Sequence, residues 1–134
     1  MNANSAEHFL FTLQNLRKAL SALETAVATP ITEQRDLSGI VKDFEIVYEL
    51  SWKALKKYLE VHGHEVKTAK HAFSIAYQLG LIEQEEVWLE MINDRNLTVH
   101  TYNENFALEL SERIRLNYLQ AFQRLEKNIL VPRF

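Results

Sequence analysis

The sequence predicts an all-α fold, an antiparallel up-and-down four-helix bundle with one additional short helix, and three observations support it. Apolar residues recur every three or four positions through most of the chain, which is the spacing of one helical face. No stretch alternates apolar and polar residues with the period of two that marks a half-buried strand. Only 3 Gly and 2 Pro occur in 134 residues, which leaves little sequence for strand-rich turns.

Five helical segments follow from this spacing, and start and stop signals bound them. Pro30 ends the first segment, and either Asp36 or Ser38 can cap the second. Thr68 is placed to cap the third, while glycines end the second and third segments at their C-termini. The expected helices are residues 5–28, 37–62 and 69–79, one that begins near 85, and 105–130.

Length and composition predict one soluble domain spanning residues 1–134. With no cysteine, no basic and apolar leader and no apolar run of about 20 residues, the chain is expected to be cytoplasmic, with no membrane contact. A net charge of -3 argues against a surface built to bind polyanions indiscriminately. Any contact with nucleic acid is therefore expected to be local.

The segment 37–62 has an apolar surface wider than one neighbouring helix requires. Phe44, Tyr48 and Trp52 lie on one side of it, and Ile46 and Tyr58 help to widen that surface. Either this helix packs on two sides, or part of it meets another subunit. We expect a homodimer.

The stretch RNLTVHTY, residues 95–102, is the candidate functional site. Arg95 is charged at any physiological pH, whereas a histidine such as His100 can take up or release a proton near neutrality, and this pairing suits phosphate chemistry. On one continuous helix the two positions point about 140° apart. Either the helix ends between them or each site draws residues from two subunits. The alternative without function is that Arg95 pairs with Asp94 or Glu90 while His100 and Tyr102 pack a helix end.

Two other groups of residues are interpreted as surface features. His62, His64 and His71 lie close together but lack the spacing of converging metal ligands, so we expect no metal and no other cofactor. The lysines of the second segment, at 53, 56 and 57, are expected to form a solvated face that is ion-paired with neighbouring glutamates rather than an RNA-binding patch.

The motif resembles the R-x4-H-x-Y signature of HEPN domains, in the branch encoded beside a minimal nucleotidyltransferase. The stretches FEIVYELSWKALKKYLEVHG and LGLIEQEEVWLEMINDRN are similar to the second helix and the approach to the motif in that branch, and the resemblance covers about residues 36–122. It implies a HEPN-like helical bundle that dimerises so that two motifs meet across a cleft.

The resemblance also implies roles for four residues. His100 would be the general acid and base in metal-independent RNA cleavage, Arg95 would hold the phosphate, and Asn96 would support one or both. Tyr102 corresponds to the tyrosine that the partner nucleotidyltransferase can adenylylate to silence such a toxin. RNA rather than DNA is the implied substrate.

Two functions remain open from the sequence. The first is the toxin of a nucleotidyltransferase/HEPN toxin–antitoxin pair, an endoribonuclease regulated by adenylylation. The second is a non-catalytic subunit of a two-component nucleotidyltransferase that binds a substrate or nucleotide. We favour the first because Arg95, Asn96, His100 and Tyr102 are all present, although the chain has no obvious basic stripe for RNA.

Overall fold

The computed structural model describes residues 3–100 and 103–130, and describes the side chains from residue 6 onward except that of His100. Within these ranges the regular elements are all helical, which confirms the predicted fold class. A π-helical turn connects the last two α-helices. The elements are α1 (Ala3–Ala28), α2 (Gln34–Val61), α3 (Ala69–Gln78), α4 (Glu85–His100), α5 (Glu104–Arg113), η1 (Ile114–Tyr118) and α6 (Leu119–Leu130).

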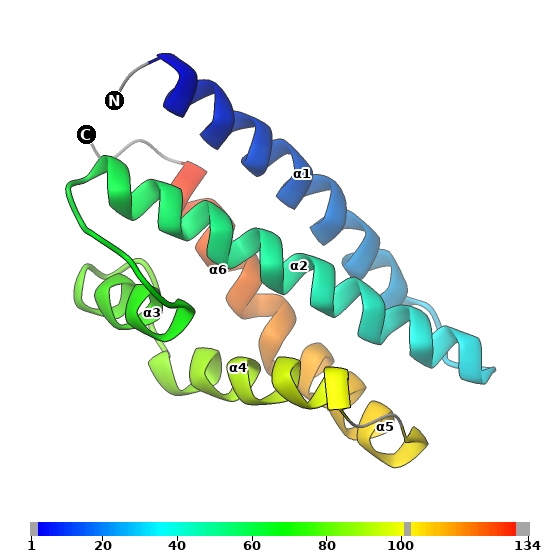
Figure 1. Ribbon diagram of the computed structural model, residues 1–134. Helices are drawn as coiled ribbons and strands as arrows, with labels where there is room; N and C mark the ends of the chain where they lie inside the picture. Colours follow the sequence, from blue (N-terminus) through cyan, green and yellow to red (C-terminus); the bar gives the residue numbers. More distant parts are fainter. Residues whose placement is uncertain (1–2, 101–102, 131–134) are drawn as a thin grey trace.

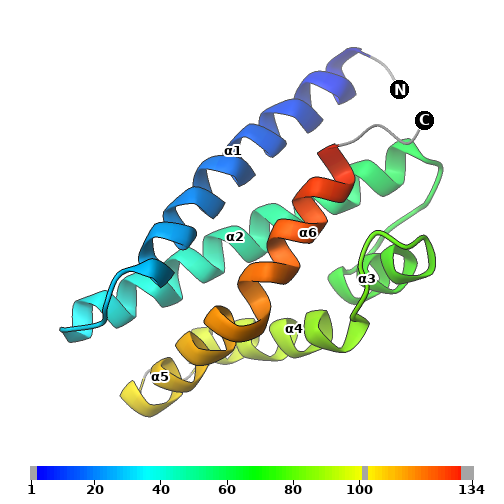
Figure 2. The same ribbon diagram turned by 180° about the vertical axis from the view of Figure 1, so that it is seen from behind.

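The long helices α1 and α2 form an antiparallel pair, and α6 crosses the face of α2 that is turned away from the viewer in Figure 1. The short helix α3 and the helix α4 lie along one side, and α5 lies near the end where α2 begins. The start of α1, the end of α2 and the end of α6 lie at the opposite end (Figure 2). The motif-bearing end of α4 is therefore remote from the first turns of α1.

Local signals account for most of the helix boundaries. Thr68 caps α3 as predicted, since its side chain accepts a hydrogen bond from the backbone N–H of His71. Gly63 and Gly80 follow α2 and α3 with φ of 89° and 77°, a conformation that glycine adopts at little cost.

The predicted start of α2 is wrong by a few residues. The N-cap is Glu33, and the helix begins at Gln34 rather than near residue 37. Asp36 does take part, because its carboxylate accepts hydrogen bonds from the backbone N–H groups of Thr32 and Glu33. These two bonds are the largest contributions that lower the pKa of Asp36.

A closed circuit of aromatic rings joins four elements in the core. Phe44 of α2 contacts Phe122 of α6 with ring centroids 6.1 Å apart, and Phe122 lies 5.6 Å from Trp88 of α4. Trp88 lies 4.7 Å from Phe73 of α3, which returns to α2 through Tyr48 at 6.3 Å. The large apolar side chains thus fix α2, α3, α4 and α6 against one another.

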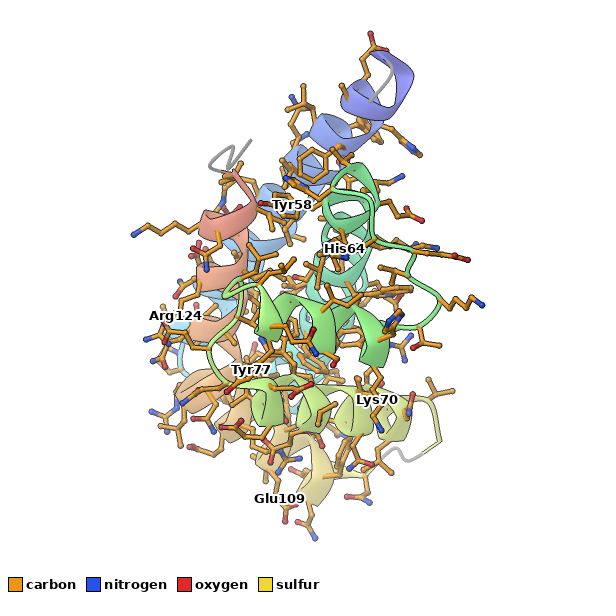
Figure 3. The ribbon with its side chains drawn as sticks, turned by 90° about the vertical axis from the view of Figure 1, so that its left-hand side faces the viewer. Tyr58, His64, Lys70, Tyr77, Glu109 and Arg124 are labelled. Atoms are coloured by element: carbon orange, nitrogen blue, oxygen red, sulfur yellow. The ribbon has the colours of Figure 1, made fainter. Side chains whose placement is uncertain are left out.

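The wide apolar surface of α2 is explained within one chain. Helix α2 packs against α1 on one side and against α3, α4, α5 and α6 on others, so it is the central element of the bundle. Tyr58, labelled in Figure 3, lies between α2 and α1, with its ring 6.3 Å from that of Phe9. Of the two explanations offered by the sequence, packing on more than one side is the one observed, while Ile46 stays exposed.

Among the described residues, none of the helices is both long and apolar enough to cross a membrane.

We expect Trp88→Ala to lower the free energy of unfolding by about 3–5 kcal/mol, because Trp88 is only 1% exposed and the core would be left with a large cavity. Trp52→Ala is the matched control, since Trp52 is half-buried and should cost clearly less. Urea denaturation followed by circular dichroism measures both. Equal losses of unfolding free energy for the two variants would contradict the conclusion that Trp88 contributes more to the core than Trp52.

Candidate functional site

The motif begins in the last turns of α4. Arg95 and Asn96 lie within the helix, and His100 is its last residue. The side chain of His100 and the whole of Tyr102 lie outside the described residues. The helix is continuous from Arg95 to His100, so the expectation that it might end between them is wrong. The motif histidine is its last described residue, and after residues 101–102 Asn103 caps α5 by accepting a hydrogen bond from Phe106 N–H at 2.7 Å.

Because the helix is continuous, positions 95 and 100 differ by about 140° around its axis. Arg95 is directed toward α2, where its Nη1 lies 3.7 Å from Glu45 Oε2 and its Nε lies 3.5 Å from Glu49 Oε1. Nη1 also donates to the Thr98 hydroxyl at 3.3 Å. Among the described side chains, Arg95 forms an ion pair with neither Asp94 nor Glu90, so the surface pairing considered from the sequence is not observed.

Arg95 is held near these carboxylates without being fully bonded. Its Nε is enclosed by protein, yet it makes no hydrogen bond within the described residues, although Glu49 is close. Ion pairs at 3.5–3.7 Å lack the fork geometry of a bidentate arginine–carboxylate pair. The guanidinium is therefore oriented by two carboxylates but keeps donor capacity for another anion.

Asp94, the residue before Arg95, anchors this end of α4. Its side chain is buried, and Arg113 binds both of its oxygens, at 2.8 Å from Nε and 2.9 Å from Nη2. The hydroxyl of Tyr118 also donates to Asp94 and lies 3.0 Å from Glu90. Burial, followed by these carboxylates, raises the pKa of Tyr118 well above its usual range.

Asn96 is exposed, on the side of α4 that faces away from the core. Leu89 and Asn93 precede it on that face at helical spacing, and position 100 follows it four residues later. The face of α4 that carries Asn96 and position 100 is therefore distinct from the face that directs Arg95 to α2.

A pocket of 270 Å³ opens beside Arg95, between the first half of α2, the end of α4 and the start of α5. Leu37, Val41 and Phe106 contribute apolar surface to it, while Lys42 and Glu104 contribute charges. Glu45 and Thr98, two of the residues that contact Arg95, also line this pocket. The pocket therefore lies directly beside the contacts of Arg95.

The groups interpreted as surface features take no part in this site. His62 is the C-cap of α2, and its ring stacks on Tyr58 with centroids 4.3 Å apart. The described part of the chain contains no group of three His, Cys, Asp or Glu side chains that could hold a metal ion. Lys56 lies over the Trp52 ring at 5.9 Å. Glu49, expected to pair with the lysine face, lies against Arg95 instead.

Sequence reasoning missed Glu45, Glu49 and the role of Asp94, although signals for them exist. Glu45 and Glu49 are four residues apart, so they share one face of α2 and can meet a single cation. Asp94 continues the buried stripe of Trp88 and Met91 at three-residue spacing. A charged residue at such an inner position requires a partner elsewhere in the fold.

The family model described as "Nucleotidyltransferase substrate binding protein like" matches residues 11–130. Among curated proteins, a probable ribonuclease HepT from Haemophilus influenzae is 29% identical over an alignment of 89 positions, which covers 63% of this chain and 61% of that protein. The match therefore spans less than two thirds of the relative's length.

Several solved structures share the fold, and two of them come from Haemophilus influenzae and Shewanella oneidensis. A Haemophilus influenzae protein described as a substrate-binding domain of a nucleotidyltransferase superposes with a TM-score of 0.76 at 25% identity, over 89% of this chain and 99% of that one. A tri-AMPylated Shewanella oneidensis HEPN toxin, solved in complex with an MNT antitoxin, gives a TM-score of 0.75 over 97% and 98% of the two chains. At 14% identity the second match supports the fold alone.

Proposed function

This chain belongs to the nucleotidyltransferase substrate binding protein like family, and on that premise we propose that it is a HEPN-type toxin that cleaves RNA without metal. The observation that carries the proposal is the intact R-x4-H-x-Y motif at the end of α4, with Arg95 oriented by Glu45 and Glu49 beside a pocket. The similarity to a probable ribonuclease in Haemophilus influenzae supports the same activity.

In the proposed reaction the ribose 2′ oxygen attacks the adjacent phosphorus, and the bond from phosphorus to the 5′ oxygen breaks. His100 takes the proton from the 2′-OH, and the imidazolium that forms gives a proton to the leaving 5′ oxygen, so the proton transfers balance without metal. Arg95 holds the phosphate and stabilises the charge that develops on its oxygens. Asn96, the next residue in the sequence, is exposed, and it positions the phosphate or the histidine.

The divergence of positions 95 and 100 favours a site that two subunits share. In a two-fold dimer the outward face of α4 meets its own copy, so Asn96 and His100 of one subunit can approach Arg95 of the other. Exposed apolar residues on or near that face, Leu97 and Val99, supply surface for such a contact.

The proposed compartment is the cytoplasm, because it contains both the RNA substrate and the ATP that the partner nucleotidyltransferase needs.

The second candidate function is the non-catalytic subunit of a two-component nucleotidyltransferase, which would present a nucleotide or other substrate to its partner. The description of the Haemophilus influenzae substrate-binding domain favours it, as does the net charge of -3. Growth after expression of the chain alone separates the two functions. Arrest that depends on His100 identifies a toxin, and normal growth favours the binding subunit.

We expect His100→Ala and Arg95→Ala each to abolish RNA cleavage while circular dichroism stays native, because both positions lie in the last turns of α4. Cleavage is measured on labelled RNA in EDTA, where the wild type should remain active. Arg124→Ala, an exposed arginine on α6 labelled in Figure 3, is the matched control and should cleave normally. Strict dependence on a divalent metal would contradict the mechanism.

The cognate nucleotidyltransferase is expected to transfer AMP from ATP to Tyr102, with the phenolic oxygen displacing pyrophosphate. The added phosphate would compete for Arg95 and silence the site. Tyr102→Phe should escape modification and keep most of its cleavage activity, since the tyrosine carries no proton in the reaction. Mass spectrometry of the peptide that contains Tyr102 measures the adduct. No added mass after incubation with partner, ATP and magnesium would count against this regulation.

A dimer of about twice 15.7 kDa is expected by light scattering at micromolar concentration. Leu97→Glu should shift it to the monomer, because Leu97 is exposed near the outward face of α4 and a carboxylate there would oppose an apolar contact. Leu10→Glu is the control, since Leu10 is exposed and lies in the first half of α1, away from α4 in sequence. A wild-type protein that stays monomeric would contradict the proposal that two subunits share the site.

A further inference from the structure

We propose that the pocket beside Arg95 binds a nucleobase that carries an exocyclic amino group, with cytosine preferred over uracil. The pocket would be the base subsite next to the phosphate that Arg95 holds. The inference rests on the proposed function for the RNA it would serve, but nucleotide binding in the pocket can be measured without any cleavage.

The position of the pocket links it to Arg95. Glu45 lines the pocket and has Oε2 at 3.7 Å from Arg95 Nη1. Thr98 also lines it and accepts a hydrogen bond from the same nitrogen at 3.3 Å. A nucleotide whose phosphate reaches Arg95 therefore places its sugar and base at the entrance of this pocket.

The walls suit a flat ring with a polar edge. Leu37, Val41 and Phe106 form apolar surface, and Phe106 is half-buried, so part of its ring remains available for stacking. Base rings stack on aromatic side chains with little dependence on sequence. The amide of Gln34 lies in the same lining and can pair with a base edge.

The charges of the lining set the preference among bases. Lys42 is the single cation of the described lining, against the carboxylates of Glu45 and Glu104, so the interior disfavours a phosphate. Carboxylates only accept hydrogen bonds, and they pair with the N4 amino group of cytosine. Uracil has a carbonyl oxygen at that position, which a carboxylate repels. A cytosine therefore fits this lining better than a uracil.

The test uses CMP and UMP as probes, because their rings differ only in the group on C4 and in the proton that uracil carries on N3. Titration of the full chain, followed by amide NMR shifts, should give a dissociation constant about tenfold lower for CMP than for UMP. The shifted amides should include those of Ala107 and Thr98. Equal affinities for the two nucleotides, or shifts confined to other regions, would overturn the proposal.

Two pairs of variants assign the binding to the pocket. Ala107→Phe fills the cavity and should abolish CMP binding, whereas Leu108→Phe adds the same ring at an exposed neighbour and should not. Glu104→Gln should reduce the difference between the dissociation constants for CMP and UMP. Its control is Glu109→Gln, an exposed glutamate of α5 at the lower end of Figure 3, outside the pocket lining. A preference unchanged by Glu104→Gln would show that the discrimination does not come from this carboxylate.

Failure of this inference and failure of the proposed nuclease give different results. CMP binding that depends on Ala107 in a chain that cleaves no RNA would support the pocket and favour the nucleotide-binding subunit. RNA cleavage that requires His100, in a chain that binds neither nucleotide, would leave the nuclease intact and remove the pocket.

Discussion

The bidentate ion pair between Asp94 and Arg113 is the contact on which the rest of the site depends. A buried carboxylate is costly unless it is paired and hydrogen-bonded, and here both oxygens of Asp94 are bound by Arg113 while Tyr118 adds a third bond. This set of bonds fixes the rotation of α4 about its own axis. With position 94 turned inward, Arg95 lies about 100° further round and reaches α2, and Asn96 about 200° round faces outward.

The π turn makes this arrangement of partners possible. Arg113 and Tyr118 are five residues apart, and in a regular α-helix they would diverge as widely as Arg95 and position 100 do. In η1 the backbone N–H of Leu119 bonds to the carbonyl of Ile114, five residues back, so this turn holds one residue more than an α-helical turn. Arg113 and Tyr118 then converge on one carboxylate.

Sequence periodicity predicted the helices well because burial of apolar stripes decides where they form. It even contained a sign of the π turn, since residues 106, 110, 114, 118 and 122 are spaced four apart throughout. A stripe with a period of four drifts by about 160° over 16 residues of a regular α-helix, so an extra residue is needed to keep it facing inward.

The partners of Arg95 were not predictable in the same way. Local rules favour Asp94 or Glu90, its neighbours along α4, but Asp94 is buried and engaged by Arg113, and Glu90 lies beside Tyr118. The carboxylates that reach Arg95 are about fifty positions away in sequence, on α2. Only the packing of α4 against α2 brings them together, and periodicity does not encode which face of one helix meets which face of another. The available clues were the four-residue spacing of Glu45 and Glu49 and the three-residue spacing from Met91 to Asp94.

The charges around Arg95 bear on how an anionic substrate would be selected. Two carboxylates, those of Glu45 and Glu49, lie against the single guanidinium of Arg95, and the chain as a whole carries a net charge of -3. Beyond about 10 Å, which is the screening length at 0.1 M salt, such a surface gives a polyanion no attraction. A phosphate that binds Arg95 must approach the carboxylates of Glu45 and Glu49, which repel it, so a phosphate alone gains little. A substrate that also places a base in the adjacent pocket, or meets a second copy of the motif, gains the additional contacts that offset this cost. The acidic setting of Arg95 therefore favours selection among RNA sites over indiscriminate binding.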